Sequence, residues 1–198
     1  MKKLIGNAAH FIEIKTFHSY CFDLLGKIGN IEESENIIKT VVDKIGDGEV
    51  EINRITKTVL VIDEAQDMDQ HEFNLIKSLM RQNEEMRVIA VGDDDQNIYE
   101  FRGSSSEHLE QFTRMARSAK HELIENFRSP ANLVDFTNQF VQTITHRLKE
   151  TPIISGCPGM GMIKIVHHQS AHLIIPIVNS VMATELSGST CILTRTNE

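Results

Sequence analysis

The sequence predicts an α/β fold built on a parallel sheet, and two apolar runs with the segment between them carry this prediction. Residues 58–62 and 87–91 are predicted strands that contain the apolar runs 59–62 and 88–91, and the first is apolar on both faces, which suits a strand covered on two sides. Residues 69–81 lie between them and space their apolar side chains as an amphipathic helix does. A strand, a helix and a second strand of this length form a parallel crossover, so both strands end at one edge of the sheet.

The sequence also predicts elements on both sides of this unit. Before residue 58, the sequence predicts a strand at 11–14, a helix that ends near Leu25 and a helix near 37–45. Ser129 and Pro130 predict a helix start, because serine is a favoured cap and proline suits the first helical position. The other predicted elements are a helix near 107–116, a strand at 122–125, loops at 126–128 and 156–161, strands at 163–166 and 191–193, and a helix at 171–186.

Composition restricts the class of protein. The chain has 198 residues, of which 40% are hydrophobic, as is ordinary for a globular protein. Its net charge of −8 does not indicate a nucleic-acid-binding surface, which is usually basic. Its three cysteines, Cys21, Cys157 and Cys191, form no C-x-x-C pair, so neither a disulfide framework nor a zinc site is indicated. No apolar run reaches the roughly 18 residues of a membrane span. These features predict a cytoplasmic protein without a membrane partner.

Acidic and amide side chains follow both apolar runs directly. Asp63 and Glu64 end the first run, and Gly92 opens a loop of three aspartates and Gln96 after the second. In open α/β sheets the ligand crevice lies outside the carboxyl ends of the strands. An aspartate there can bind Mg²⁺, a glutamate can activate a water, and a glutamine can orient a phosphate or that water. The alternative is a solvated acidic loop without such a function.

Three further side chains suit contacts with nucleic acid or phosphate. Tyr99 and Phe101 alternate with Glu100, so both rings can face one way and stack on bases of single-stranded DNA. The alternative is a pair of core aromatic residues. Arg128 carries a permanent charge that suits phosphate oxygens, or it forms a structural ion pair.

Five segments resemble the motifs of UvrD/Rep-like superfamily 1 DNA helicases, in type and in order. Residues 63–67, Asp-Glu-Ala-Gln-Asp, and residues 91–104 resemble the second and third motifs, and the third-motif match is highly specific. Residues 16–21 resemble the motif before the acidic box. Residues 123–130 resemble the motif that opens the second motor domain, and residues 192–197 resemble a later strand of it. A superfamily 2 DEAD-box protein can carry the same acidic box but lacks the third-motif segment.

This resemblance implies a RecA-like parallel sheet with flanking helices, of the P-loop NTPase type, and a site for ATP and Mg²⁺. Asp63 would hold Mg²⁺, and Glu64 would be the catalytic base. Gln96 would sense the γ-phosphate, and Arg128 would reach across the cleft as an arginine finger. Arg102 has two implied roles, a contact with phosphate groups of DNA or closure of the ATP site. The side chains assigned to DNA contacts are Thr16, His18, Tyr99, Phe101 and Arg102.

One motif of that family is absent from the sequence. The helicases carry a G-x-x-x-x-G-K-[ST] phosphate loop, whose amides and lysine cradle the phosphates. The only Gly-Lys pair, at Gly26, is not followed by serine or threonine, and Cys21 stands where the first glycine should be. The expectation is an internal part of a longer helicase, with residues 1–118 from the first motor domain and residues 119–198 from the start of the second. Such a chain alone would not hydrolyse ATP.

The interpretation from sequence is therefore an ATP-dependent DNA helicase or translocase that acts on single-stranded DNA and duplex junctions. Only the resemblance implies its 3′-to-5′ polarity and a place in DNA repair. Two alternatives stay open. One is a non-enzymatic DNA-binding or assembly module that keeps the helicase framework. The other is a different Mg²⁺-dependent phosphohydrolase, which would leave Tyr99, Phe101 and Arg128 without a role.

Overall fold

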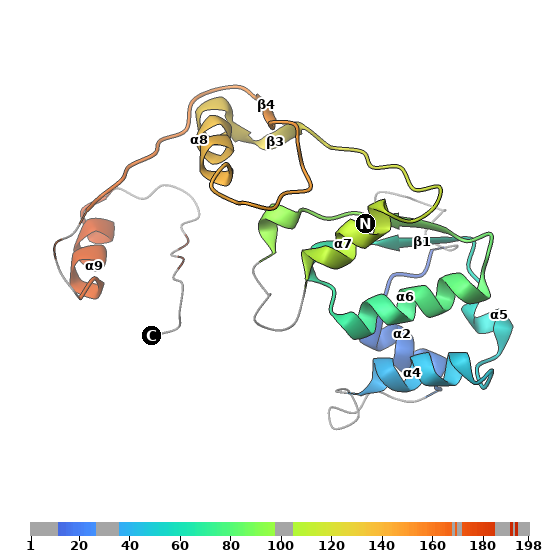
Figure 1. Ribbon diagram of the computed structural model, residues 1–198. Coiled ribbons are helices and arrows are strands. Elements are labelled where there is room, and N and C mark those ends of the chain that lie inside the picture. Colours follow the sequence, from blue (N-terminus) through green and yellow to red (C-terminus); the bar gives the residue numbers. More distant parts are fainter. Residues whose placement is uncertain are drawn as a thin grey trace.

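The chain folds into a mixed α/β structure with two small parallel sheets (Figure 1). The computed structural model describes residues 12–26, 36–97, 105–167, 169, 172–184, 191 and 193. One sheet pairs β1 (Val59–Ile62) with β2 (Arg87–Ala90), and the other pairs β3 (Glu125–Pro130) with β4 (Ile154–Cys157). The predicted α/β class and the parallel pairing of the first sheet are confirmed.

The strand–helix–strand unit around β1 and β2 forms as the sequence predicts. The two strands run parallel, with Ile62 opposite Ala90. Between them, α6 (Gln70–Gln82) begins after Asp69, whose carboxylate accepts a hydrogen bond from the Glu72 amide at 2.8 Å. Glu72 in turn accepts from the Asp69 amide at 3.1 Å. This capping box satisfies two amides that have no partner within the helix, and so it fixes where α6 starts.

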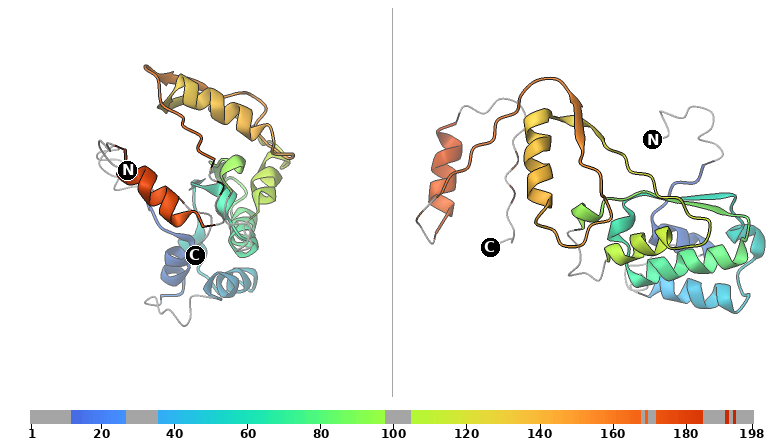
Figure 2. Two further views of the ribbon diagram at one scale, coloured as in Figure 1. Left: turned by 90° about the vertical axis from the view of Figure 1, so that its left-hand side faces the viewer. Right: turned by 45° about the horizontal axis from the view of Figure 1, so that its top comes forward.

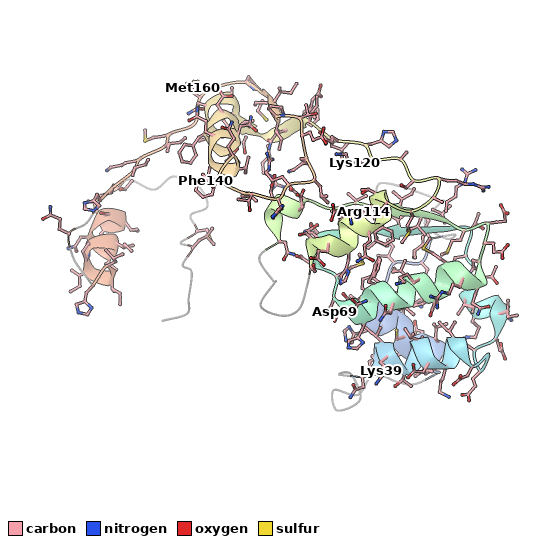
Figure 3. All side chains as sticks on the ribbon, in the orientation of Figure 1. Lys39, Asp69, Arg114, Lys120, Phe140 and Met160 are labelled. Atoms are coloured by element: carbon pink, nitrogen blue, oxygen red, sulfur yellow. The ribbon has the colours of Figure 1, made fainter. Side chains whose placement is uncertain are left out.

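Two adjoining apolar clusters form the core. On one side of α6, Phe73 and Ile76 pack toward β1 and the turn that follows it. On the other side, Leu75 and Leu79 pack against α2 (Phe17–Leu24) and α4 (Ile37–Gly46). Figures 1 and 2 show these three helices stacked on the same side of the β1–β2 sheet, and Figure 3 shows the side chains between them.

The opposite face of this sheet has no cover from the described residues. Val61 is 61% exposed and Ile89 is 51% exposed. The sequence predicts a strand covered on two sides, and this expectation is not met in the described part. Successive side chains of a strand point to opposite faces, so a continuous apolar run such as β1 places apolar side chains on both faces of the sheet. This is the pattern of a strand that is buried on both sides.

The second sheet departs from the prediction. The strand expected at 122–125 lies further along the chain, because pairing with β4 extends β3 through the predicted loop as far as Pro130. Ser129 is consequently a strand residue, whose carbonyl accepts from the Ser155 hydroxyl at 2.6 Å. The next helix, α8 (Ala131–Val141), begins after Pro130 without a side-chain cap. The predicted Ser129 cap is therefore wrong.

Other strand predictions are also wrong in the described part. Residues 12–14, 163–166, 191 and 193 form no strand, whereas Gly156, predicted in a loop, lies in β4. Residues 11 and 192 lie outside the described ranges. These short apolar runs have no neighbouring strand among the described residues, and a strand needs a hydrogen-bonded partner.

The other predicted helices are also present, with ends that differ from the predicted ones by a few residues. They are α2, α4, α7 (Ser106–Thr113) and α9 (Ile174–Met182), and a short α5 (Ile52–Ile55) was not predicted. Figures 1 and 2 show α9 apart from the other helices. None of the helices in the described ranges has both the length and the apolar content needed to cross a bilayer.

Candidate functional site

The loops that follow β1 and β2 lie side by side at one edge of the sheet. The Val91 amide donates to the Ile62 carbonyl at 2.8 Å, and the Ala65 amide donates to the Val91 carbonyl at 2.9 Å. The parallel register therefore brings Asp63 and Gly92 to the same edge. The prediction that both acidic loops open at one edge is confirmed.

A buried glutamine joins these two loops. Gln66 lies in the short 3₁₀ turn η2 (Ala65–Asp67) and is 2% exposed. Its Oε1 accepts from the Asp93 amide at 3.0 Å, and its Nε2 donates to Glu64 Oε2 at 2.8 Å. Gln66 is not among the residues that the sequence predicts for the site. The available signal was an amide two positions after Glu64 in the acidic segment, since a buried amide needs polar partners on both its ends.

The close approach of the loops requires a glycine at position 92. A Cβ atom there would lie 2.7 Å from Gln66 Oε1 and 3.2 Å from the Ala65 backbone nitrogen. Glu64 is also unusual, because its φ of 52° is in the left-handed region that non-glycine residues seldom occupy. Such backbone conformations carry a cost and gather at functional sites.

The edge displays three of the predicted site residues together. Asp63, Glu64 and Gln96 are all exposed. Gln96 closes the turn η3 (Asp94–Gln96), and its Nε2 donates to Asp93 Oδ2 at 2.6 Å. An exposed carboxylate at a strand end, as at Asp63, supplies the hard oxygen ligand that Mg²⁺ favours.

Asp67 adds an unusual carboxylate to this region. Its Oδ1 is buried and has no hydrogen-bond partner among the described residues. Burial raises the pKa of Asp67, and the charge of nearby Glu64 raises it further. The carboxylate therefore holds a proton more readily than an ordinary aspartate does.

The three aspartates of the second loop are engaged by other groups of the protein. Asp93, Asp94 and Asp95 place carboxylate oxygens within 4.8 Å of one another, a spacing that alone would suit a metal ion. However, Arg147 binds Asp95 through two hydrogen bonds of 2.8 Å, and Lys149 contacts Asp93 at 2.6 Å. The bonds from Arg147 lower the pKa of Asp95. Asp93 and Asp95 are thus paired with cations, and Asp94 accepts from the Leu148 backbone amide, so the exposed Asp63 remains the better metal ligand.

The other predicted site residues that the structure describes make only local hydrogen bonds or are exposed. Arg128 is exposed in β3, and its backbone amide donates to Asn126 Oδ1 at 2.9 Å. Among the described residues, the cations that contact the acidic loop are Arg147 and Lys149, which sequence analysis missed. Thr16 and His18 are exposed at the start of α2, where Thr16 Oγ1 accepts from the Ser19 amide at 3.2 Å. Tyr99, Phe101 and Arg102 lie outside the described residues.

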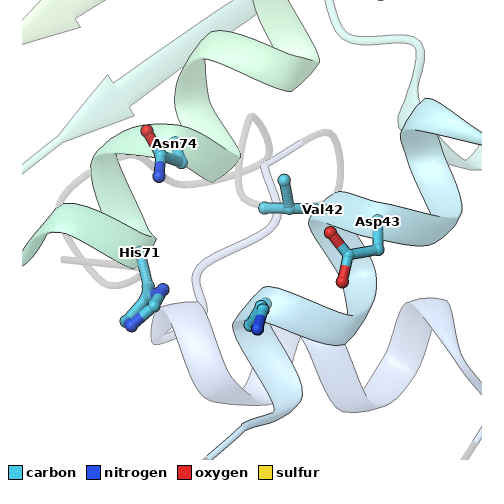
Figure 4. A pocket seen from close by; sticks show the side chains of 5 residues that line it. Val42, Asp43, His71 and Asn74 are labelled. Atoms are coloured by element: carbon cyan, nitrogen blue, oxygen red, sulfur yellow. The ribbon is translucent and has the colours of Figure 1, made fainter.

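A shallow pocket of about 180 Å³ lies elsewhere, between α4 and α6. Figure 4 shows side chains from both helices lining it, and none belongs to the acidic loops. The lining residues are Lys39, Val42, Asp43, His71 and Asn74.

The geometry defines an α/β protein whose polar loops gather at the carboxyl edge of a parallel sheet, the usual place for a ligand site in this class. Residues 50–117 match the model of the UvrD/REP helicase N-terminal domain. The match contains β1, α6, β2 and both acidic loops. This part of the chain is therefore UvrD/Rep-like, as the motifs in the sequence indicate.

The chain also matches individual proteins that are named as helicases of this kind. The chain is 33% identical over 89 residues to DNA helicase II of Haemophilus influenzae, a match that covers 45% of this chain and 12% of the relative. It is 30% identical over 103 residues to DNA helicase II of Escherichia coli, covering 52% and 14%. It is 27% identical over 137 residues to the ATP-dependent DNA helicase Rep of Buchnera aphidicola, covering 68% and 20%. The chain thus spans a fifth or less of the length of these relatives.

Proposed function

We propose that this chain contributes to an ATP-dependent DNA helicase or translocase with a RecA-like motor fold. The observation that carries the proposal is the contact of the two acidic loops through Gln66, within the segment that matches the helicase family. Relatives that bear the names DNA helicase II and Rep support the activity. The 3′-to-5′ polarity and a role in DNA repair belong to this proposal as well.

Each residue at the sheet edge has a role in this proposal. Asp63 would hold Mg²⁺, which supplies positive charge for the phosphates. Glu64 would accept a proton from the attacking water, and its hydrogen bond from Gln66 fixes the orientation of the carboxylate. Gln96 would orient the γ-phosphate or the water, and Arg128 would stabilise developing charge. The residues proposed for single-stranded DNA are Thr16, His18, Tyr99, Phe101 and Arg102.

The chain does not supply every part of an ATP site. Its sequence contains no G-x-x-x-x-G-K-[ST] motif, so no lysine and amide cradle for the phosphates is present in these 198 residues. We therefore expect negligible Mg²⁺-dependent ATP turnover from the purified chain. Robust hydrolysis that disappears in Glu64→Gln would overturn this expectation.

A chimeric helicase tests the proposed function directly. Residues 50–157 of this chain replace the corresponding segment of DNA helicase II from Escherichia coli, which keeps its own phosphate loop. We expect the chimera to hydrolyse ATP when single-stranded DNA is present, and Glu64→Gln to reduce the turnover number by roughly 10²–10⁴-fold, the usual contribution of a general base. Glu84→Gln, at an exposed turn after α6, is the matched control and should leave turnover unchanged. Equal turnover in the Glu64→Gln and unmodified chimeras would remove the proposed base.

A non-enzymatic DNA-binding module is the second candidate. The absence of a phosphate loop and the pairing of Asp93 and Asp95 with cations of the chain favour it. A folded chimera that binds single-stranded DNA without any ATP turnover would support this candidate over the motor.

A further inference from the structure

A segment from far along the chain holds the acidic loop that follows β2. Residues 147–149 lie between α8 and β4 and contact the three aspartates in reverse order. Arg147 binds Asp95 through two nitrogens at 2.8 Å, and Lys149 contacts Asp93 at 2.6 Å. The intervening backbone amide donates to Asp94. Each aspartate therefore has its own partner in the segment.

These contacts are partly withdrawn from solvent. The side chain of Asp95 is 8% exposed, that of Lys149 is 18% exposed and that of Arg147 is 22% exposed. Lys149 also reaches Asp95, at 3.1 Å. Salt screens partly buried ion pairs less than surface pairs. A bidentate arginine–carboxylate contact also fixes the relative orientation of the two groups. The contacts thus specify one arrangement of the two segments.

Asp93 connects these contacts to the proposed catalytic edge. Lys149 binds its Oδ1, while Gln96 Nε2 donates to its Oδ2 at 2.6 Å. The Asp93 amide donates to Gln66, which in turn donates to Glu64. A cation from the second sheet region therefore touches the carboxylate that orients Gln96, and a short series of hydrogen bonds leads on to Glu64.

We propose that Arg147 and Lys149 are positioning residues. They form a clasp through which the β3–α8–β4 lobe, residues 125–157, sets the conformation of the acidic loop and the orientation of Gln96. The importance of Gln96 rests on the proposed function, whereas the clasp itself rests on the contacts alone. Movement of this lobe relative to β1 and β2 would change the acidic loop because the clasp joins them.

Hydrogen exchange of the full chain, without nucleotide, tests the clasp. In an Arg147→Gln/Lys149→Gln variant, the amides of residues 93–97 should lose protection, whereas those of α6 should keep it and report an intact fold. Arg114→Gln is the matched control, because Arg114 is an exposed arginine directly after α7 that pairs with Glu110. It should leave exchange at 93–97 unchanged. Unchanged protection of residues 93–97 in the double variant overturns the clasp.

In the chimera that carries residues 50–157, Lys149→Gln should lower the turnover number more than the affinity for single-stranded DNA. A chimera without any turnover removes the proposed function, while the exchange measurements still decide the clasp.

Discussion

The side chain of Gln66 accepts a hydrogen bond from the Asp93 amide at 3.0 Å, although the two residues are 27 positions apart. The same side chain donates to Glu64 at 2.8 Å and is almost completely buried. Pairing of β1 with β2 brings the two loops to one edge, and Gln66 then determines which atoms face each other. The geometry of the candidate site therefore depends on a residue that lies beneath its surface.

Replacement of Gln66 by leucine should destabilise the chain. The change substitutes an apolar side chain of similar size and leaves the buried Asp93 amide without its partner. We expect the free energy of unfolding to fall by roughly 1–3 kcal/mol, measured by urea denaturation. Gln70→Leu is the control, because Gln70 is an exposed glutamine on α6 that bonds only to Asn74 among the described residues. Equal losses for the two variants would contradict a special role for Gln66.

Gly92→Ala should disturb the same contact from the opposite loop. The added methyl group would lie 2.7 Å from Gln66 Oε1, so the loops must separate or the glutamine must move. We expect a loss of roughly 1–3 kcal/mol in the free energy of unfolding, as in other overpacked sites. Gly46→Ala is the control, because a Cβ atom there meets nothing within 4 Å and Gly46 ends α4. That variant should be neutral or slightly more stable.

A double variant separates steric conflict from general damage at this position. If the clash with Gln66 causes the loss, Gly92→Ala should cost less in a Gln66→Ala background than in the wild-type chain, because the shorter side chain leaves room. Additive losses would show that Gly92 acts through another contact.

The sequence predicted the β1–α6–β2 unit because its signals are local. The period of apolar residues in α6 is readable without knowledge of any distant residue. The extent of β3 was not predictable in this way, since it depends on pairing with β4. Arg147 and Lys149 were missed for the same reason, because their contacts with the acidic loop join residues more than 50 positions apart.

Cys21 should be the least reactive of the three cysteines. It is fully buried beneath α4, and burial raises the pKa of its thiol to about 12. The thiolate is the reactive form, so a thiol reagent at pH 8 should modify Cys21 only after unfolding. Cys191 is exposed and serves as the internal reference. Mass spectrometry of the modified peptides measures both rates, and equal rates under native conditions would contradict the packing of α2 against α4.

The pairing of Asp95 should make part of the stability depend on pH. Hydrogen bonds from Arg147, with a smaller contribution from Lys149, lower the pKa of Asp95 in the folded chain. The unfolded value is about 3.9. The stabilisation is therefore complete above that value and is lost as the pH falls through the lower folded-state pKa.

Asp95→Asn tests this dependence because it keeps the shape of the side chain and removes its charge. At about pH 6 the variant should unfold at a lower urea concentration than the wild-type chain. At about pH 2.5 the two urea midpoints of unfolding should lie closer together. Asp135→Asn, at an exposed position of α8, should show little difference at either pH. A difference for Asp95→Asn that stays constant between the two pH values would mean that the aspartate stabilises the chain without its charge. In that case Arg147 and Lys149 would hold the loop by hydrogen bonding and packing alone.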